Sequence, residues 1–502
     1  MGLAEQGYHW LPLLEAWESI PPLEAGAEVN RRFCGYEGVW CRFIMATTYT
    51  QQLEGVVALV HGPESCVAAT RNFKMTNYSL FWGNPFLHTP CTAMDEMGCI
   101  MGGARQLEEA IAAVDRDYGP PLILIFETCA TSMIDDNIPH IIGRVQPKVR
   151  AKLVYIPSGG LTSPWNGRSC ELTAESYVDV MEPPERVDPG LVNILGFYKD
   201  AGCTRGRKYP GDASELSRLV EGLGLRVHRM LNSGDYDYVR TAAEAGVNAI
   251  NCPTWGYPLA RKMEKRFGTP WLKQAMPCGL KTTGRWLREL AAATGRQEQA
   301  ERFIAAEEAK LLPEIEELSK LCRGRVALVE CGRNAQGSLA RPLQYGRMLR
   351  ELGVVSYFFN LHPMELKARK DDVDCYVWDG YSPQVLVGPY PYQRPVDTLE
   401  VMRDLGLDRD QVVYLWEDAF PYSRAGQFDA SDVAWVNTSV HFRRTKEGPF
   451  RSIGYAGTAS LCRSIREALK VGQRKNRPTL YGRVNSRTPF DFQIPSPLTG
   501  EG

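Results

Sequence analysis

Short apolar runs of strand length alternate with amphipathic helical patterns along most of this chain, and no other feature constrains its fold as strongly. Largely apolar runs at 56–60, 122–126, 192–195 and 326–330 are bounded by glycine, proline or polar residues, as buried strands are. Strands that alternate with helices favour parallel sheets built from right-handed crossover units. The pattern occurs three times, which predicts an α/β protein with three Rossmann-like, doubly wound domains.

The expected boundaries follow from where these patterns begin and end. We expect a helical lead-in at 1–38 and an extended tail at 473–502. The three α/β domains are placed at 39–185, 186–322 and 323–472, with a linker rich in proline and glutamate between the first two. Further expected elements are strands at 154–156, 226–228 and 247–250, and helices at 104–111, from 131 onward, at 213–223, 237–245, 284–322 and 459–470.

Composition excludes several classes of function. The 502 residues carry a net charge of −1, which gives no sign of a surface for nucleic acid. No apolar stretch reaches the ~18 to 20 residues of a membrane span, and the N-terminus lacks the features of a secretory signal. We therefore expect a cytoplasmic protein with no nucleic-acid or membrane partner, whose 14 cysteines are reduced thiols.

The strands carry no phosphate-binding loop of their own. The sequence contains no G-x-x-x-x-G-K-S/T motif, and no G-x-G-x-x-G follows any of the predicted strands. If ATP takes part in the function, we expect a partner protein to bind it.

Cysteines follow two successive predicted strands. Cys66 comes shortly after the run at 56–60, Cys129 shortly after the run at 122–126, and Cys41 lies 25 residues before Cys66. Open parallel sheets place their ligands at the carboxyl ends of their strands. These cysteines therefore suggest a shared site for a soft metal, although most cysteines in a chain of this kind are ordinary core residues.

The stretches around these cysteines resemble the nitrogenase component 1 family. The resemblance rests on His61-Gly62-Pro63-Glu64-Ser65-Cys66 and on the stretch from Glu127 through Cys129 to Asp136. A Cys91–Gly103 stretch, with departures, and Ile453-Gly454-Tyr455-Ala456-Gly457 extend it over residues 34–470. It implies that Cys41, Cys66 and Cys129 bind an [8Fe-7S] P-cluster-like bridging cluster, with the remaining ligands coming from a homologous sister subunit. Cys34 is the alternative to Cys41.

The resemblance also implies a second site in the middle domain. Cys252, which follows the strand at 247–250, and His441 stand where the family's α-type subunits hold a nitrogenase-type complex iron–sulfur cofactor. His228 and Arg333 are candidate catalytic groups near it. The alternatives are a core role for Cys252 and a surface position for His441. The sequence after Cys252 departs from the family's pattern, and other stretches look β-type, so a different substrate is expected.

Among nitrogenase-like reductases, the chain most resembles methylthio-alkane reductase. That resemblance implies reductive C–S cleavage, which releases methanethiol and a hydrocarbon from a small-molecule substrate. The implied partners are the sister subunit, in an α2β2 heterotetramer, and a separate ATP-dependent [4Fe-4S] reductase component. A nitrogenase subunit that reduces dinitrogen, a cofactor-assembly scaffold of the same fold, and a binding protein with incidental cysteines remain as alternatives.

Overall fold

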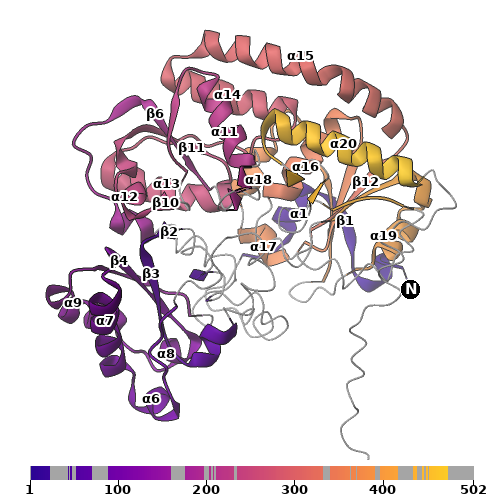
Figure 1. Ribbon diagram of the computed structural model, residues 1–502. Helices are drawn as coiled ribbons and strands as arrows, with labels where there is room; N and C mark the ends of the chain where they lie inside the picture. Colours follow the sequence, from indigo (N-terminus) through magenta and orange to yellow (C-terminus); the bar gives the residue numbers. More distant parts are fainter. Residues whose placement is uncertain are drawn as a thin grey trace, which may run out of the picture.

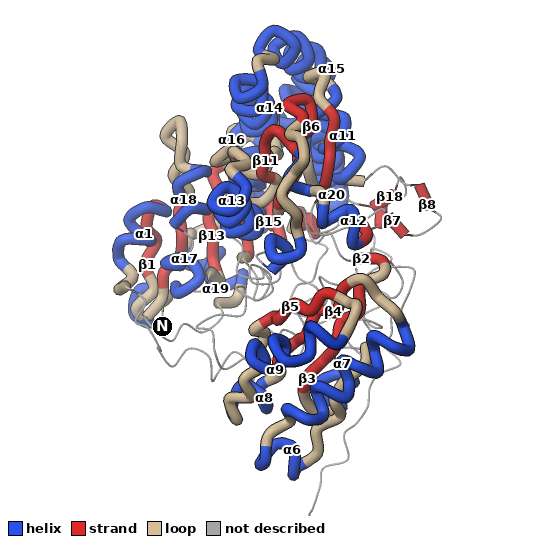
Figure 2. The backbone as a smooth tube through the Cα atoms, turned by 90° about the vertical axis from the view of Figure 1, so that its left-hand side faces the viewer, coloured by secondary structure: helices blue, strands red, loops and turns tan. Residues whose placement is uncertain are grey.

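Three largely parallel sheets organise the computed structural model of this chain (Figure 1). The structure describes residues 2–22, 53–69, 89–159, 176–196, 211–230, 234–331, 340–361, 363–368, 370–389, 396–416, 433–437 and 452–472, with short pieces at 43, 46–47, 203–204, 207–208, 444–445 and 448–449. The first sheet and its helices lie at one end of the molecule, and the other two sheets lie together (Figure 2).

The first sheet has the order β3-β4-β5 and is parallel throughout. Its strands are β3 (Val56–His61), β4 (Leu122–Glu127) and β5 (Lys152–Ile156). The accompanying helices are α6 (Glu96–Met101), α7 (Ala104–Tyr118), α8 (Cys129–Met133), α9 (Ile138–Val145) and the 3₁₀ turn η3 (Gln146–Lys148). Helices α7 and α9 cover one face of the sheet (Figures 1 and 2).

The central strand of this sheet is buried on both faces. Ile123 and Ile125 of β4 pack under α7 and α9, whereas Leu124 and Phe126 point into the main core on the other face. Side chains alternate across a strand, so a continuous apolar run is what a strand covered on both faces requires. The apolar run at 122–126 therefore becomes the strand that the sequence predicts.

The second sheet has the order β11-β6-β9 and is also parallel. Its strands are β6 (Asp188–Leu195), β9 (Arg226–Met230) and β11 (Ala245–Ile250). Its helices are α11 (Asp212–Glu221), α12 (Tyr236–Arg240), η4 (Ala242–Glu244), α13 (Pro253–Phe267), α14 (Leu280–Thr294) and α15 (Gln297–Cys322). Short pairs join β10 (Gly234–Asp235) to β2 (Leu53–Glu54) and β7 (Cys203–Thr204) to β8 (Arg207–Lys208).

The third sheet has the order β1-β14-β13-β12-β15-β16. Its strands are β1 (His9–Pro12), β12 (Val326–Glu330), β13 (Val355–Phe359), β14 (Gln384–Val387), β15 (Val412–Trp416) and β16 (Ala434–Asn437). The helices are η1 (Ala4–Gln6), α1 (Leu13–Ser19), α16 (Ala340–Glu351), α17 (Pro363–Ala368), α18 (Lys370–Tyr376), α19 (Thr398–Asp404), η5 (Arg409–Gln411) and α20 (Gly454–Gly472), and β17 (Arg444–Thr445) pairs with β18 (Gly448–Pro449).

Two local predictions, for the lead-in and for the helix after Cys129, are wrong. The lead-in is not only helical, because its residues 9–12 form β1, which pairs antiparallel with β14 at the edge of the third sheet. The helix expected to start at Thr131 begins instead at Cys129, with Thr128 as its N-cap, and ends at Met133. Asp135 then adopts a left-handed backbone conformation with φ 55°, which stops the helix.

Long helices occur in the second and third units, but none is built to cross a lipid bilayer. Within the ranges that the structure describes, no helix combines the length and the apolar character that a membrane span requires.

Candidate functional site

The register of the first sheet brings two cysteine-bearing turns to one edge. His61, the last residue of β3, lies opposite Glu127, the last residue of β4. The two segments that follow these strands leave the sheet side by side. One leads to Cys66 in the helical turn at 64–69, and the other leads to Cys129 at the start of α8. The structure therefore places Cys66 and Cys129 past the carboxyl ends of adjacent parallel strands, where this fold class binds ligands.

Burial separates the cysteines of the first unit from the others. Cys66, Cys91, Cys99 and Cys129 are half-buried, whereas six cysteines of the other two units are buried. Those six are Cys252, Cys278, Cys322, Cys331, Cys375 and Cys462. A half-buried thiol past the end of a strand can bind a metal together with ligands from a second chain.

The two turns are hydrogen-bonded to each other through the end of β3. The hydroxyls of Thr128 and Thr131 both donate to the His61 carbonyl oxygen, at 3.0 and 3.2 Å. The approach is close at Gly62, where an added Cβ would lie 2.2 Å from the Thr128 hydroxyl oxygen. A side chain at position 62 would therefore push the two turns apart.

The His61 side chain is completely buried behind these turns. Its Nδ1 lies 3.1 Å from the Thr92 hydroxyl oxygen, and its Nε2 lies 3.0 Å from Oδ2 of Asp136. The same Asp136 oxygen accepts the Gly103 amide at 2.8 Å. Burial lowers the pKa of His61 more than the neighbouring Asp136 raises it, so the ring is neutral at physiological pH.

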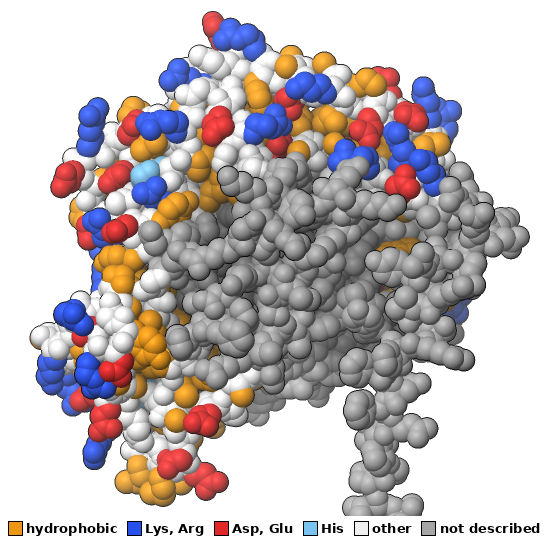
Figure 3. Space-filling model, in the orientation of Figure 1, with side chains coloured by type: hydrophobic (Ala, Val, Ile, Leu, Met, Phe, Trp, Pro, Cys, Tyr) orange, Lys and Arg blue, Asp and Glu red, His pale blue; other side chains and the backbone are white. Residues whose placement is uncertain are grey.

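Exposed apolar side chains gather beside this edge. Met97, Ile100 and Met101 of α6 and Met133 of α8 are 60, 73, 76 and 72% exposed, and we call them the methionine surface. Helices α6 and α8 lie close together in both views, and hydrophobic side chains appear at this end of the molecule in Figure 3. Asp136, three residues after Met133, binds the start of α7 just after α6, so the two parts of the surface are physically joined.

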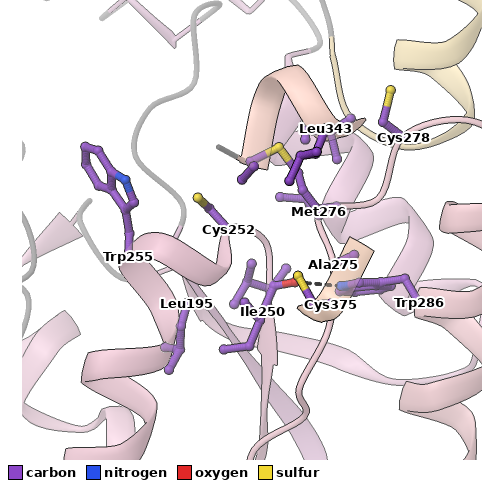
Figure 4. Close-up of a cluster of buried hydrophobic side chains, with 14 of the residues drawn as sticks. Leu195, Ile250, Cys252, Trp255, Ala275, Met276, Cys278, Trp286, Leu343 and Cys375 are labelled. Carbon is purple, nitrogen blue, oxygen red and sulfur yellow. Dashed lines mark hydrogen bonds between the residues drawn. The ribbon is translucent and has the colours of Figure 1, made fainter. Parts of the chain in front are cut away.

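A second thiol occupies a strand end in the middle of the molecule. Cys252 follows β11 and is the N-cap residue of α13, with its side chain buried in the main core. Figure 4 shows the Cys252 thiol directed away from Ile250 and Trp286, on the side of Trp255. The Cys278 thiol points away from Cys252. A helix N-terminus favours a negative charge, which suits a thiolate ligand.

The other predicted site residues are placed differently. His228 lies within β9, which continues to Met230, so the expectation that it ends its strand is wrong. Its Nε2 donates to the Thr241 carbonyl oxygen at 2.9 Å, and burial lowers its pKa. Its assignment as a pocket group stays a prediction. Cys41, Arg333 and His441, as well as the alternative Cys34, lie outside the described residues.

No set of three or more His, Cys, Asp or Glu side chains in the described ranges is grouped closely enough to hold a metal ion alone. Sequence reasoning also missed Thr92, Gly103 and Asp136. The acidic pair Asp135-Asp136 was the available signal, and the sequence pattern assigned it to the first turn of a helix.

Fold and thiol positions together define a class of chain: an α/β protein of parallel sheets with soft donors at the carboxyl ends of its strands. The nitrogenase component 1 type oxidoreductase family matches residues 41–387. The chain therefore belongs to this family, as its motifs indicated.

Individual relatives agree with this assignment. The nitrogenase iron-molybdenum cofactor biosynthesis protein NifE of Methanococcus maripaludis is 27% identical over 370 residues, which cover 71% of each chain. The nitrogenase molybdenum-iron protein alpha chain of Methanosarcina barkeri is 26% identical over 314 residues, 60% of this chain and 56% of that one. A solved chain described as nitrogenase Cp1 at pH 6.5 superimposes with a TM-score of 0.66 at 14% identity, over 87% of this chain and 93% of that chain. The predicted fold class is confirmed.

Proposed function

We propose that this chain is a subunit of a nitrogenase-like, ATP-dependent iron–sulfur reductase. The observation that carries the proposal is the convergence of the Cys66 and Cys129 turns at one edge of the first sheet, with both thiols half-buried. Thiolates are the ligands that iron–sulfur clusters require, and half-buried ligands leave room for a second chain to complete the site.

The donor set fits a bridging cluster shared with a sister subunit. Cys66 and Cys129 supply two thiolates, and we assign the third to Cys41. Two described thiols at one edge are too few to hold a cluster alone, which agrees with ligands from Cys41 and from a sister chain in an α2β2 heterotetramer. When bound, an [8Fe-7S] cluster at this edge would store electrons and pass them inward.

We assign the second site to Cys252, with His441 as the other protein ligand of a nitrogenase-type cofactor. The N-terminus of α13 would favour a thiolate at Cys252 once a metal is bound there, and the residue lies among apolar side chains. His228 and Arg333 are the proposed polar groups of the substrate pocket.

The proposed partner on the methionine surface is the ATP-hydrolysing [4Fe-4S] reductase component. The surface consists of exposed apolar side chains, and a bound partner would remove them from water. They are Met97, Ile100, Met101 and Met133. Met133 is four residues from Cys129 in the same helix, so a partner bound here would reach the bridging site directly.

The proposed reaction is reductive cleavage of a methylthio-alkane. With two electrons from the reductase component and two protons from solvent, R–S–CH3 gives R–H and CH3SH. The C–S bond breaks, a C–H bond and an S–H bond form, and the carbon that loses sulfur is reduced.

Turnover with defined substrates tests this proposal. The chain would be purified anaerobically with its sister subunit, mixed with the ATPase component, and supplied separately with ethyl methyl sulfide, dinitrogen and acetylene. ATP-dependent release of methanethiol and ethane from the sulfide supports the proposal. Reduction of dinitrogen without sulfide cleavage would contradict the substrate assignment.

A second candidate function is supported by the names of the relatives. Several of them are NifE proteins, which are described as acting in biosynthesis of the iron-molybdenum cofactor. A scaffold of this kind would bind a cluster and pass it to an acceptor protein without turning over a substrate. Transfer of iron to an apo acceptor, together with no reduction of any of the three substrates, would favour the scaffold.

A further inference from the structure

The buried groups behind the two cysteine turns form one continuous hydrogen-bond network. Thr92 Oγ1 accepts the Gly62 amide at 3.0 Å and lies 3.1 Å from His61 Nδ1. At the other side of the ring, Asp136 Oδ2 lies 3.0 Å from His61 Nε2 and accepts the Gly103 amide. A carboxylate only accepts, so Nε2 carries the proton and Nδ1 accepts from the Thr92 hydroxyl.

This hydrogen-bond network connects several segments around the end of β3. Thr92 belongs to an extended segment that runs along β3, because Thr92 N donates to Val60 O and Met94 N donates to Gly62 O. Asp136 belongs to the loop after α8, and Gly103 is the N-cap of α7. His61 itself accepts the Thr128 and Thr131 hydroxyls through its carbonyl oxygen. One residue thus links the turn that bears Cys66 to the turn that bears Cys129.

The packing around the ring leaves no space for adjustment. A Cβ added to Gly103 would lie 2.6 Å from Cε1 of His61, and the Asp136 side chain is only 8% exposed. A buried hydrogen-bond network is rigid, because breaking any of its bonds leaves a buried polar group unsatisfied.

We propose that His61, Thr92 and Asp136 form a positioning unit, which fixes the turns at 62–66 and 128–132 relative to each other before any cluster binds. These three residues do not ligate metal. They act through Gly62 and Thr128, which precede the two cysteines. The role in cluster binding rests on the proposed function, whereas the rigidity of the turns belongs to the chain without metal.

Amide hydrogen exchange of the full metal-free chain tests the positioning unit directly. Asp136→Ala removes the acceptor for two buried donors, and we expect exchange at 62–66 and at 128–132 to rise by roughly tenfold or more. Asp136→Asn places an amide oxygen where Oδ2 accepts both bonds, so exchange should stay within about threefold of the parent chain. Thr92→Val should loosen 62–66 more than 128–132.

Asp115 offers a matched control in the same unit. Its Oδ1 accepts the backbone amides of Arg150 and Ala151, at the opposite end of the sheet from the cysteines. Asp115→Ala should raise exchange near 150–151 and leave both cysteine turns unchanged. Unchanged exchange in Asp136→Ala, or equal loosening of the turns in Asp115→Ala, would overturn the proposal.

Iron content separates this inference from the proposed function. In the complex with the sister subunit, Asp136→Ala should lower iron at the bridging site at least about twofold, while Asp136→Asn and Asp115→Ala retain it. A parent complex without iron would refute the reductase assignment and leave the exchange result to decide the positioning unit.

Discussion

At the residue scale, His61 stabilises the end of β3 in two ways, through its backbone carbonyl and through its ring. Its carbonyl oxygen accepts the hydroxyls of Thr128, the N-cap of α8, and of Thr131 within α8, and its ring lies between Thr92 and Asp136. Because burial keeps the ring neutral, it donates one proton and accepts another without placing a charge beside the thiols. The local geometry of the cysteine turns is therefore set by hydrogen bonds through a neutral imidazole ring and by close packing.

Close packing at Gly103 makes a sharp prediction. Gly103→Ala would bring a methyl group to 2.6 Å from His61 and 2.8 Å from the Met94 sulfur, so we expect a loss of about 1 to 3 kcal/mol in stability. Thermal unfolding of the metal-free chain measures this loss. Gly143→Ala in α9 is the control, since no atom lies within 4 Å of its added Cβ and a helical alanine is favourable. Equal effects in the two variants would contradict the packing account.

Residue identities were predictable only in part. The positions of Cys66, Cys129 and Cys252 at strand ends follow from apolar runs and the polar residues after them. The role of Asp136 does not, because its partners His61 and Gly103 are 75 and 33 residues away. Short-range patterns carry no information about such contacts.

At the element scale, apolar runs predicted strands well and helix ends poorly. The run at 122–126 is a strand because both of its faces are covered, and this is visible in sequence as continuous hydrophobicity. Helix α8 starts earlier than predicted because Thr128 and Thr131 form a capping box with each other. Residues 9–12 become a strand because they meet β14, about 375 residues later, and no local pattern signals this pairing.

The Glu351 carboxylate lies between two helices, and we expect it to make the stability of the chain depend on pH. Glu351, at the end of α16, accepts the Leu280 and Lys281 amides at the start of α14. Burial nevertheless raises the pKa of Glu351 to about 7 from its ordinary value of 4.5. The folded chain then binds this proton more tightly than the unfolded chain, so its contribution to stability is present at low pH and is lost as pH rises through about 7.

We expect the stability of the metal-free chain to fall by an amount on the order of 3 kcal/mol between about pH 4.5 and about pH 7 through this group. Glu351→Gln should flatten that part of the profile, because glutamine does not titrate. Thermal unfolding at a series of pH values compares the two chains, and identical slopes would show that Glu351 titrates normally.

At the scale of the whole molecule, the first unit differs from the rest in its surface. The other two units share a large core with six buried cysteines, whereas the first unit carries the half-buried thiols and the methionine surface. Under the proposed function, electrons would enter at the first unit and be used deeper inside the molecule. Sequence patterns predicted the class of fold. The exposure of the thiols and of the methionine surface depends on tertiary packing, so only the structure shows it.

Under the proposed function, the methionine surface is where we expect the reductase component to bind. Met101→Glu places a charge in the apolar surface, and we expect the KM for the reductase component to rise about tenfold or more while iron content stays unchanged. Leu312→Glu is the control, because Leu312 is 44% exposed on α15, in a different unit. Steady-state turnover at varied reductase concentration measures both. An unchanged KM in Met101→Glu would show that the reductase component does not bind at the methionine surface.

Iron and acid-labile sulfide in the anaerobically purified complex test the central claim most directly. The account predicts that the parent complex contains both, that Cys66→Ala and Cys129→Ala each lose the bridging cluster, and that Cys99→Ala, a half-buried thiol of the same unit, retains it. A parent complex without acid-labile sulfide, or unchanged iron in Cys66→Ala, would contradict it.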